Sequence, residues 1–346
     1  MLRSRVVAIL AVMLSLAAVI VPPAGPVAAA ASLRATRLND LGTLGGNYSE
    51  AFAINALGQV VGVSTTTSGE RHAFFWTAGR GMRDLGTLGG SSSTARGINL
   101  RGQVVGWSTS ANGQDHAFIW TATGGMRDLG ALGRPRSYAY GINDRGQVVG
   151  YTAALAQDPP FSRISHAAFI WTAAAGMHDL RAPDDQWSEA WDINRSGQVV
   201  GSRGGRAFRW TARDGMQDLG VPDGRARSYA NSINDRGQIA GWSEGLSPTR
   251  DARHILTWTA GRGLRDLVAT PDVDATAQDI NARGQLIGET LNGPLYWTER
   301  DGLQHVTLAS LGGADYVNAM NNRGQLAGWS SNATGEQHAC LWTLND

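Results

Sequence analysis

The sequence has no lysine: all 30 basic residues are arginine, and 29 acidic residues nearly balance them. A chain with a formal net charge of +1 lacks the basic face that nucleic acids select and the polybasic segment that anionic membranes attract. Cysteine occurs once, which excludes an internal disulfide framework and a zinc site built from several thiolates. We therefore expect no nucleic-acid partner, no metal site and no cofactor.

Proline is scarce and no Gly-X-Y period is present, so the chain is not collagen-like. Disorder is excluded as well, because 42% of the residues are hydrophobic and the net charge is low. What the chain has in excess is glycine, with 45 of 346 residues, and tryptophan, with 12. This composition indicates a neutral globular protein of substantial size.

Only one long apolar run is present, close to the first residue. Two arginines precede the mostly apolar segment 6–21, prolines follow it, and small residues occupy 28–31. This order is typical of a secretory signal peptide over residues 1–31, with cleavage near Ala30. The run is shorter than the ~20 residues of a membrane-spanning helix, so we expect a secreted protein without membrane contact after cleavage. Arginine without lysine also suits a GC-rich bacterial genome.

The rest of the chain is a repeat. One asparagine recurs seven times at spacings of 44, 44, 51, 40, 47 and 40 residues, and a glutamine follows each one four residues later. The asparagines are Asn55, Asn99, Asn143, Asn194, Asn234, Asn281 and Asn321. A tryptophan closes each copy, at Trp76, Trp120, Trp171, Trp210, Trp258, Trp297 and Trp342.

Each repeat of about 44 residues predicts four short strands. In the second repeat, strand one ends at Asn99, and an Asn-x-x-Gly turn leads into the Gln-Val-Val-Gly strand. A His-Ala-Phe-x-Trp strand and a strand that begins at Met126 complete the unit. Four strands at this period predict one all-β domain over 32–346, a seven-bladed β-propeller of four-stranded antiparallel blades that is monomeric.

Both ends of the repeat array fit a closed ring. The array begins with an isolated fourth strand over 39–42 and ends just after a third strand over 339–342. We expect the N-terminal strand to complete the last blade, which leaves few free sheet edges. A solenoid is the alternative fold, but it needs capping repeats at both ends, and none is visible.

These motifs resemble the HAF-repeat family of probable extracellular repeat proteins. The resemblance rests on the His-Ala-Phe strand, the Ile-Asn-x-x-Gly-Gln-Val-Val-Gly unit and the Asp-Leu-Gly-Thr-Leu-Gly-Gly link, and it covers about residues 38–343. Later copies depart from the pattern: Arg206 and Pro294 replace the histidine, Val306 the aspartate and Cys340 the phenylalanine. The resemblance implies export and a β-propeller-like fold, and it brings no activity and no catalytic residue.

A residue that recurs once per repeat is more typical of structure than of ligand binding, because one ligand does not need seven identical groups. We therefore interpret the asparagines and glutamines as turn and inter-strand hydrogen-bonding groups, and the seven tryptophans as packing between blades. Cys340 is predicted to be a buried, inert thiol. Five histidines lie one per blade, too far apart to share a metal ion: His72, His116, His166, His254 and His338.

Differences between the repeats are the better signal of function. The link between the second and third strands varies in length, and the residues seven, five and three positions before each asparagine vary in type. If strand one is innermost, these residues surround the mouth of a central channel, where aromatic rings can stack on sugars and polar groups can bind hydroxyls. The alternative is that they only fill the channel mouth. The candidate ligand-binding residues are Tyr48, Glu50, Arg96, Tyr138, Trp187, Glu189, Trp191, Tyr229 and Tyr316.

Two classes of function follow from this pattern. The one we prefer is a secreted binding scaffold whose partner is a carbohydrate, a cell-wall polymer or an extracellular protein. The alternative is a secreted hydrolase or lyase that uses a carboxylate pair at the channel mouth, for which Glu50 and Glu189 stand at equivalent positions. No residue is assigned as catalytic. A passive surface-matrix protein without a ligand is a third possibility.

Overall fold

The computed structural model describes residues 33–158, 161–180, 187–245, 252–268 and 274–345. The predicted signal peptide lies outside these residues. In the described part of the chain every regular element is a β-strand, and no helix there is long and apolar enough to cross a membrane. The all-β prediction is therefore confirmed for these residues.

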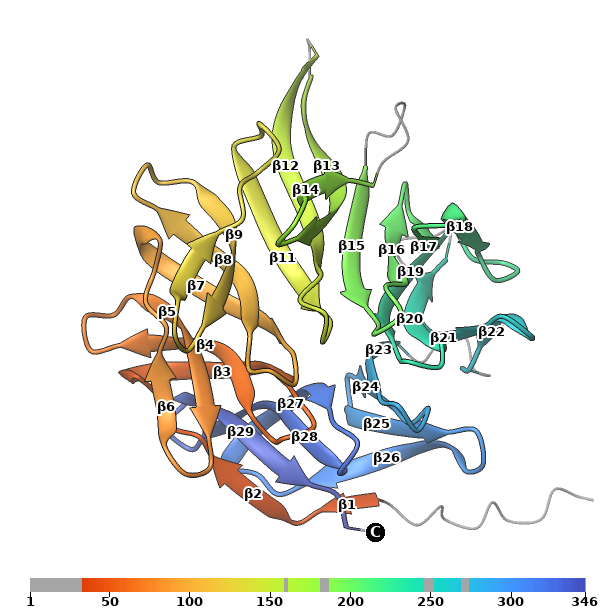
Figure 1. Ribbon diagram of the computed structural model, residues 1–346. Coiled ribbons are helices and arrows are strands. Elements are labelled where there is room, and N and C mark those ends of the chain that lie inside the picture. The colour runs from red at the N-terminus through yellow and green to blue at the C-terminus, as the bar shows by residue number, and fades with distance from the viewer. Residues whose placement is uncertain (1–32, 159–160, 181–186, 246–251, 269–273, 346) are drawn as a thin grey trace, which may run out of the picture. The chain divides into compact units, whose positions relative to one another are not determined.

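Repeats 1 to 6 form four consecutive strands each, and repeat 7 forms three (Figure 1). The first three repeats contain β3 (Gly45–Ile54), β4 (Val60–Thr66), β5 (Arg71–Thr77) and β6 (Gly81–Asp84); β7 (Gly89–Ile98), β8 (Val104–Ser110), β9 (Asp115–Thr121) and β10 (Gly125–Asp128); and β11 (Arg136–Ile142), β12 (Val148–Asp158), β13 (Phe161–Thr172) and β14 (Gly176–Asp179). The other repeats contain β15 (Ser188–Ile193), β16 (Val199–Arg203), β17 (Arg206–Thr211) and β18 (Gly215–Gly220); β19 (Arg227–Ile233), β20 (Ile239–Glu244), β21 (His254–Thr259) and β22 (Gly263–Asp266); β23 (Ala275–Ile280), β24 (Leu286–Thr290), β25 (Gly293–Thr298) and β26 (Gly302–Leu308); and β27 (Gly312–Met320), β28 (Gln325–Asn332) and β29 (Gln337–Thr343).

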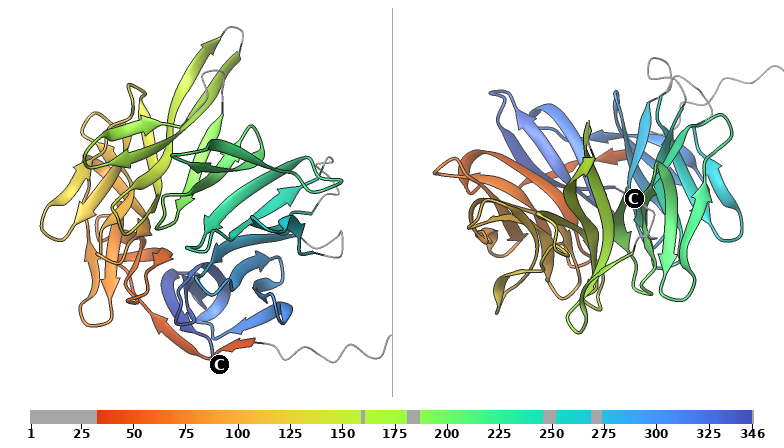
Figure 2. Two further views of the ribbon diagram at one scale, coloured as in Figure 1. Left: turned by 45° about the vertical axis from the view of Figure 1, so that its right-hand side comes forward. Right: turned by 90° about the horizontal axis from the view of Figure 1, so that it is seen from above.

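Within each repeat the strands pair antiparallel in chain order, which places strand one at one edge of its sheet. Each first strand contacts the first strands of the repeats before and after it, and β27 of repeat 7 contacts β3 of repeat 1. Figure 2 shows the sheets side by side in this order. The first strands therefore line the inner side of the array, which is the arrangement that the channel-mouth hypothesis assumed.

The N-terminal strands join the end of the array. β2 (Arg37–Asp40) pairs antiparallel with β29, from Arg37 opposite Thr343 to Asp40 opposite Cys340, and so adds a fourth strand to repeat 7. The sequence predicted this strand over 39–42, two residues later than it is found. It did not predict β1 (Leu33–Ala35), which pairs parallel with β26 and buries Ala35, because three residues carry no readable periodicity.

Two repeated polar groups connect neighbouring repeats. Each asparagine accepts backbone N–H bonds within its own turn through Oδ1 and donates through Nδ2 to the backbone oxygen of the next repeat's asparagine, at 2.9 Å from Asn55 to Asn99. The series continues through all seven and returns from Asn321 to Asn55 at 3.1 Å. The turn role predicted for these asparagines is confirmed, and the bond between repeats is an additional role.

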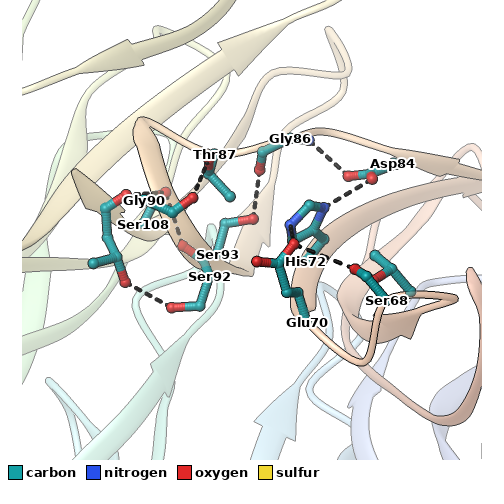
Figure 3. A network of polar contacts seen from close by, with 12 residues as sticks. Ser68, Glu70, His72, Asp84, Gly86, Thr87, Gly90, Ser92, Ser93 and Ser108 are labelled. Atoms are coloured by element: carbon teal, nitrogen blue, oxygen red, sulfur yellow. Dashed lines mark hydrogen bonds and ion pairs between the residues drawn. The ribbon is translucent and has the colours of Figure 1, made fainter. Parts of the chain in front are cut away.

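The second connector is a serine six residues before the asparagine, which the sequence analysis missed. Ser93 donates to the Gly86 backbone oxygen at 2.6 Å and accepts from the Ala73 backbone N–H of repeat 1 at 2.8 Å (Figure 3). Ser49, Ser137, Ser188 and Ser228 accept the equivalent bond from the preceding repeat. Because these hydroxyls are buried and fully bonded, they fix the spacing of adjacent sheets.

Apolar packing follows the same order. Seven clusters of buried residues each join two neighbouring repeats, and one of them joins repeat 7 to repeat 1 through Leu341 and Phe74. The closing tryptophans belong to these clusters, which confirms their predicted packing role. Cys340 is fully buried in one cluster, and burial raises the pKa of its thiol to about 12, so it is inert as predicted.

Candidate binding site at the channel mouth

A cavity of about 370 Å³ lies where the seven first strands meet. We call it the mouth cavity, and its lining residues are Phe52, Arg96, Tyr140, Trp191, Tyr229, Asn231, Trp242, Gln278 and Asn318. Seven of these nine are the residues three positions before the repeated asparagines, one from each repeat. The position three residues before the asparagine therefore lines this cavity in every repeat.

A β-bulge places each of these seven side chains. In repeat 2, Ala95 pairs with Gly106 and Gly97 pairs with Val105, which leaves Arg96 without a partner on the neighbouring strand. The same register shift occurs at the equivalent position of every repeat. A bulge leaves one residue unpaired and re-aims its side chain. Seven bulges therefore direct seven side chains of six residue types at one cavity.

Arg96 is the one charged residue among the lining residues. Its guanidinium carbon lies 4.1 Å from the ring centre of Phe52, 5.3 Å from that of Trp107 and 5.4 Å from that of Tyr140. These cation–π contacts, each of about 0.5–2 kcal/mol, hold the cation in place. In the described part of the chain Arg96 has no carboxylate partner, and its buried Nε has no hydrogen-bond acceptor.

An aromatic series runs outward from Arg96 across repeats 2 to 4. Trp107 contacts Tyr138 at 5.4 Å between ring centres, and Tyr138 contacts Tyr151 at 5.2 Å. The imidazole of His166 stacks on Tyr151 at 4.5 Å between ring centres, and Trp187 contacts the same imidazole at 3.9 Å with its ring tilted by 31°. Trp187 is 41% exposed, so the series ends at the surface. This series includes two of the predicted aromatic residues.

His166 does not belong to the histidine series, and this corrects the sequence analysis. The equivalent of His72 is Ala167, because His72 pairs with Ser64 and Ala167 pairs with Thr152, while His166 lies one residue earlier. A shift of one residue turns a side chain to the other face of a strand. The series members bond an aspartate on their own fourth strand or on β2, as His72 does to Asp84 at 2.8 Å (Figure 3), whereas His166 points to repeat 4.

The partner of His166 is Glu189, one of the predicted binding residues. His166 Nδ1 and Glu189 Oε1 lie 2.5 Å apart, and Glu189 is only 8% exposed. The carboxylate is therefore engaged in orienting a histidine that is already held between Tyr151 and Trp187. Glu189 supports the aromatic series and does not line the mouth cavity.

Repeats 1, 6 and 7 place polar groups on the other side of the mouth cavity. Asn318 Nδ2 donates to Glu50 Oε1 at 3.1 Å, and the Tyr48 hydroxyl donates to Glu50 Oε2 at 2.7 Å. Burial and the adjacent Glu50 raise the pKa of Tyr48 to about 12. Gln278 Nε2 donates to the Tyr316 hydroxyl at 2.7 Å, and burial raises the pKa of Tyr316 to about 12. Both tyrosines are neutral at physiological pH.

The remaining two predicted residues contact the cavity directly. Tyr229 stacks on Trp242 at 4.1 Å, and both line the mouth cavity from repeat 5. Trp191 lies edge-on to Tyr140 at 4.7 Å, and its indole Nε1–H is buried without an acceptor. Of the nine predicted residues, Arg96, Trp191 and Tyr229 line the cavity. Glu50 and Tyr316 bond lining residues, whereas Tyr48, Tyr138, Trp187 and Glu189 contact residues outside the lining.

Glu50 and Glu189 come from different repeats, 1 and 4, and each is bonded to its own neighbours instead of to a common group. A third carboxyl group, Glu289, was missed by the sequence analysis. It follows the last glycine of strand two, where four of the other repeats carry tryptophan or tyrosine, and it accepts the Val317 backbone N–H at 2.7 Å. Burial raises its pKa to about 8, so the group is mostly protonated at neutral pH.

A second missed position is the residue immediately before the third-strand histidine. It contacts the variable residues of the next repeat: Asp115 Oδ2 accepts from the Tyr138 hydroxyl at 3.3 Å, and Arg253 Nη2 lies 2.7 Å from Asp274 Oδ2. The signal was present in the sequence, because this position varies while the histidine after it recurs.

Comparisons with known proteins show the fold and no more. No family model matches the chain, and no curated protein matches it in sequence. The β-propeller domain of the Trilobed protease from Pyrococcus furiosus is similar, with 8% identity over 86% of this chain and 93% of that chain and a TM-score of 0.57. This likeness shows that the chain has a β-propeller fold.

Two peptidases are similar over about half of their own length. The Pyrococcus horikoshii acylaminoacyl peptidase has 10% identity over 89% of this chain and 53% of that chain, with a TM-score of 0.56. A Mycobacterium tuberculosis puromycin-hydrolyzing peptidase has 11% identity over 89% of this chain and 56% of that chain, with a TM-score of 0.53. At these identities the likeness concerns the propeller fold alone.

Proposed function

We propose that the protein is a secreted β-propeller that binds a carbohydrate or cell-wall polymer at the mouth cavity. The observation that carries the proposal is the set of seven β-bulges, which present seven side chains of six residue types to one cavity of about 370 Å³. A cavity of this size holds a small ligand such as one or two sugar rings. The lining residues differ between repeats, which suits recognition of an asymmetric ligand. A structural role would need the same residue in every repeat.

The chemistry of the cavity supports a sugar as the ligand. Aromatic rings of Tyr140, Trp191 and Trp242 offer apolar faces, and the side-chain amides of Asn231 and Gln278 offer both donors and acceptors. Sugars present the same combination, with apolar ring faces and rims of hydroxyl groups. Trp187, exposed at the end of the aromatic series, would extend the contact surface for a polymer.

The scaffold in this proposal is a seven-bladed ring that β2 closes by completing the last blade. Support comes from the series of asparagine bonds that returns from Asn321 to Asn55 and from the pairing of β2 with β29. Membership of the HAF-repeat family and export through the signal peptide are part of the same proposal. Both rest on the sequence motifs alone.

A binding screen of the purified protein against glycans and cell-wall polymers tests the proposal. We expect binding that weakens when Trp187, Tyr229 or Tyr138 is changed to alanine, because each substitution removes an aromatic face at or around the cavity. Leu57→Ala serves as the control, since Leu57 is exposed in an Asn-x-x-Gly turn. Binding that survives all three aromatic substitutions would show that the mouth cavity is not the binding site.

A hydrolase or lyase is the second candidate, and Glu289 is the observation that favours it. A carboxyl group kept protonated near neutral pH is what a general acid requires, and Tyr316 lies in the field of both Glu289 and Glu50. The same polymers, incubated with the protein and assayed for new reducing ends, decide between the two. Release of product that stops in Glu289→Gln would establish the enzyme and displace the binding scaffold.

A further inference from the structure

We infer that the ligand of the mouth cavity carries a carboxylate, and that Arg96 binds it; an acidic sugar unit is the ligand class that fits. The inference rests on the proposed carbohydrate-binding function and narrows it. It starts from the charge of the cavity, where Arg96 is the one ionisable cation and no carboxylate belongs to the lining residues.

The described residues supply no anionic partner for the Arg96 guanidinium. A half-buried guanidinium normally has a carboxylate partner, as Arg253 has in Asp274. Arg96 has only aromatic faces around it, and its buried Nε–H lacks an acceptor. A guanidinium binds a planar carboxylate through two parallel hydrogen bonds, which would satisfy these donors.

A second unsatisfied donor belongs to the same cavity. The indole Nε1–H of Trp191 is buried without an acceptor, and both Trp191 and Arg96 contact Tyr140. A buried donor left unpaired is destabilising, and both residues that carry these donors line the cavity, so the site favours a ligand with acceptor oxygens. Neither donor is repeated: the equivalent positions hold phenylalanine, tyrosine or an amide.

The aromatic surroundings of Arg96 argue against a positively charged ligand. Clusters of tyrosine and tryptophan rings often bind cationic ligands, but here the Arg96 guanidinium already occupies the space between Phe52, Trp107 and Tyr140. A cationic ligand would meet like charge. A neutral sugar would leave the guanidinium without its ionic partner, so the cavity prefers the acid form of a sugar.

Two carboxylates outside the lining contact lining residues, and both are already bonded. Glu244 accepts from the Tyr229 hydroxyl and from Arg227, and the other carboxylate is that of Glu50. Its two oxygens accept hydrogen bonds from Tyr48 and from Asn318, and Asn318 separates it from the cavity. The ligand carboxylate is therefore expected on the repeat 2 side, at Arg96, with its hydroxyl groups towards the amides of Asn231, Gln278 and Asn318.

The test uses matched ligands on the purified protein, followed by tryptophan fluorescence or calorimetry. Glucuronate and galacturonate are compared with their uncharged amides, which keep the sugar ring and remove only the charge. We expect at least one acid to bind 10- to 100-fold more tightly than its amide, the range that loss of a charged hydrogen-bond pair produces. Acetate and inorganic phosphate serve as anions without a sugar ring and are expected to bind more weakly than the acid.

Variants assign the preference to Arg96. In Arg96→Gln the acid and the amide should bind equally, and Arg96→Lys should retain part of the preference. Arg101→Gln is the charge-matched control, because Arg101 is exposed in the turn of the same repeat. Circular dichroism checks the fold of each variant, and the acid–amide comparison on the unaltered protein stands even if one variant does not fold.

The outcomes separate this inference from the proposed function. Equal binding of acid and amide, or binding of neutral polymers alone in the glycan screen, overturns the carboxylate assignment and leaves carbohydrate binding intact. Acetate or phosphate binding as tightly as the acid overturns the sugar as ligand class. A preference for the acid that persists in Arg96→Gln overturns the role of Arg96. Absence of all carbohydrate binding in the screen overturns both proposals.

Discussion

At the scale of single residues, departures from the repeat carry the information about function. A histidine in register bonds an aspartate of its own sheet or of β2, but His166, displaced by one position, stacks between Tyr151 and Trp187 and bonds Glu189. Arg96 differs in the same way from its six equivalents, since it alone brings a charge to the cavity. Both residues differ between copies while the surrounding scaffold stays the same.

Buried acids give the protein a dependence of stability on pH. Burial raises the pKa of Glu289 from its ordinary value near 4.5 to about 8 and that of Asp192 from 3.8 to about 6. The folded state therefore holds protons that the unfolded chain has lost, and this stabilisation is complete below about pH 4 and disappears as the pH rises through the folded values. We expect the free energy of unfolding to fall between pH 5 and pH 8, with Glu289 contributing on the order of 2–4 kcal/mol.

The substitution Glu289→Gln isolates this contribution. Glutamine keeps the acceptor for the Val317 backbone N–H and cannot ionise, so urea unfolding should show a flatter pH dependence and a more stable protein at pH 8. Glu70→Gln, at an exposed position, is the control and should follow the unaltered protein. A Glu289→Gln profile parallel to that of the unaltered protein would show that Glu289 does not titrate in this range.

At the scale of the strand pair, the bulge and the glycine opposite it form one unit. A Cβ atom added to Gly106 would lie 1.9 Å from the Thr94 backbone oxygen and 2.9 Å from the Ala95 Cα, so the two strands would have to separate. The equivalent glycines 62, 150, 201, 241 and 328 meet the same obstacle at 1.9 Å. This close approach explains why the Val-Val-Gly motif ends in glycine.

We expect Gly106→Ala to destabilise the protein by at least about 1–3 kcal/mol, because backbone atoms must move to admit the methyl group. Gly79→Ala is the matched control, since nothing lies within 4 Å of its added Cβ, and it should change stability by no more than about 1 kcal/mol. Chemical unfolding measures both. Equal effects of the two substitutions would mean that the bulge adapts to a side chain.

Much of the strand arrangement could be predicted from the sequence, because turn residues and the repeated Gln-Val-Val-Gly unit mark local boundaries. The bulges could not be predicted from the sequence, because a strand with one extra residue has the same composition as a regular strand. In repeat 2 the bulge is visible only in the pairing of the first strand with Gly106. The roles of Glu289 and Asp115 depend on contacts with the next repeat, which periodicity does not encode. The sequence therefore predicts the region of the candidate site more accurately than the individual residues that line the cavity.

At the scale of the whole array, asparagine bonds and apolar clusters connect each repeat to the next, and a buried serine adds a third contact at five of the seven junctions. The asparagine bonds, the buried serines and the apolar clusters all link repeat 7 to repeat 1 as well, through Asn321 and Asn55, Ala339 and Ser49, and Leu341 and Phe74. Contacts between neighbouring repeats hold the seven bulges in fixed positions, and rigid positions are what a selective binding site requires.

The most direct test of the central claim is a crystal structure of the protein with the tightest-binding acidic sugar from the matched-ligand experiment. We expect electron density for one sugar unit in the mouth cavity, with its carboxylate within hydrogen-bond distance of the Arg96 guanidinium and its ring against Trp191 or Tyr140. Density in a groove between the outer strands, with the mouth cavity empty, would contradict it.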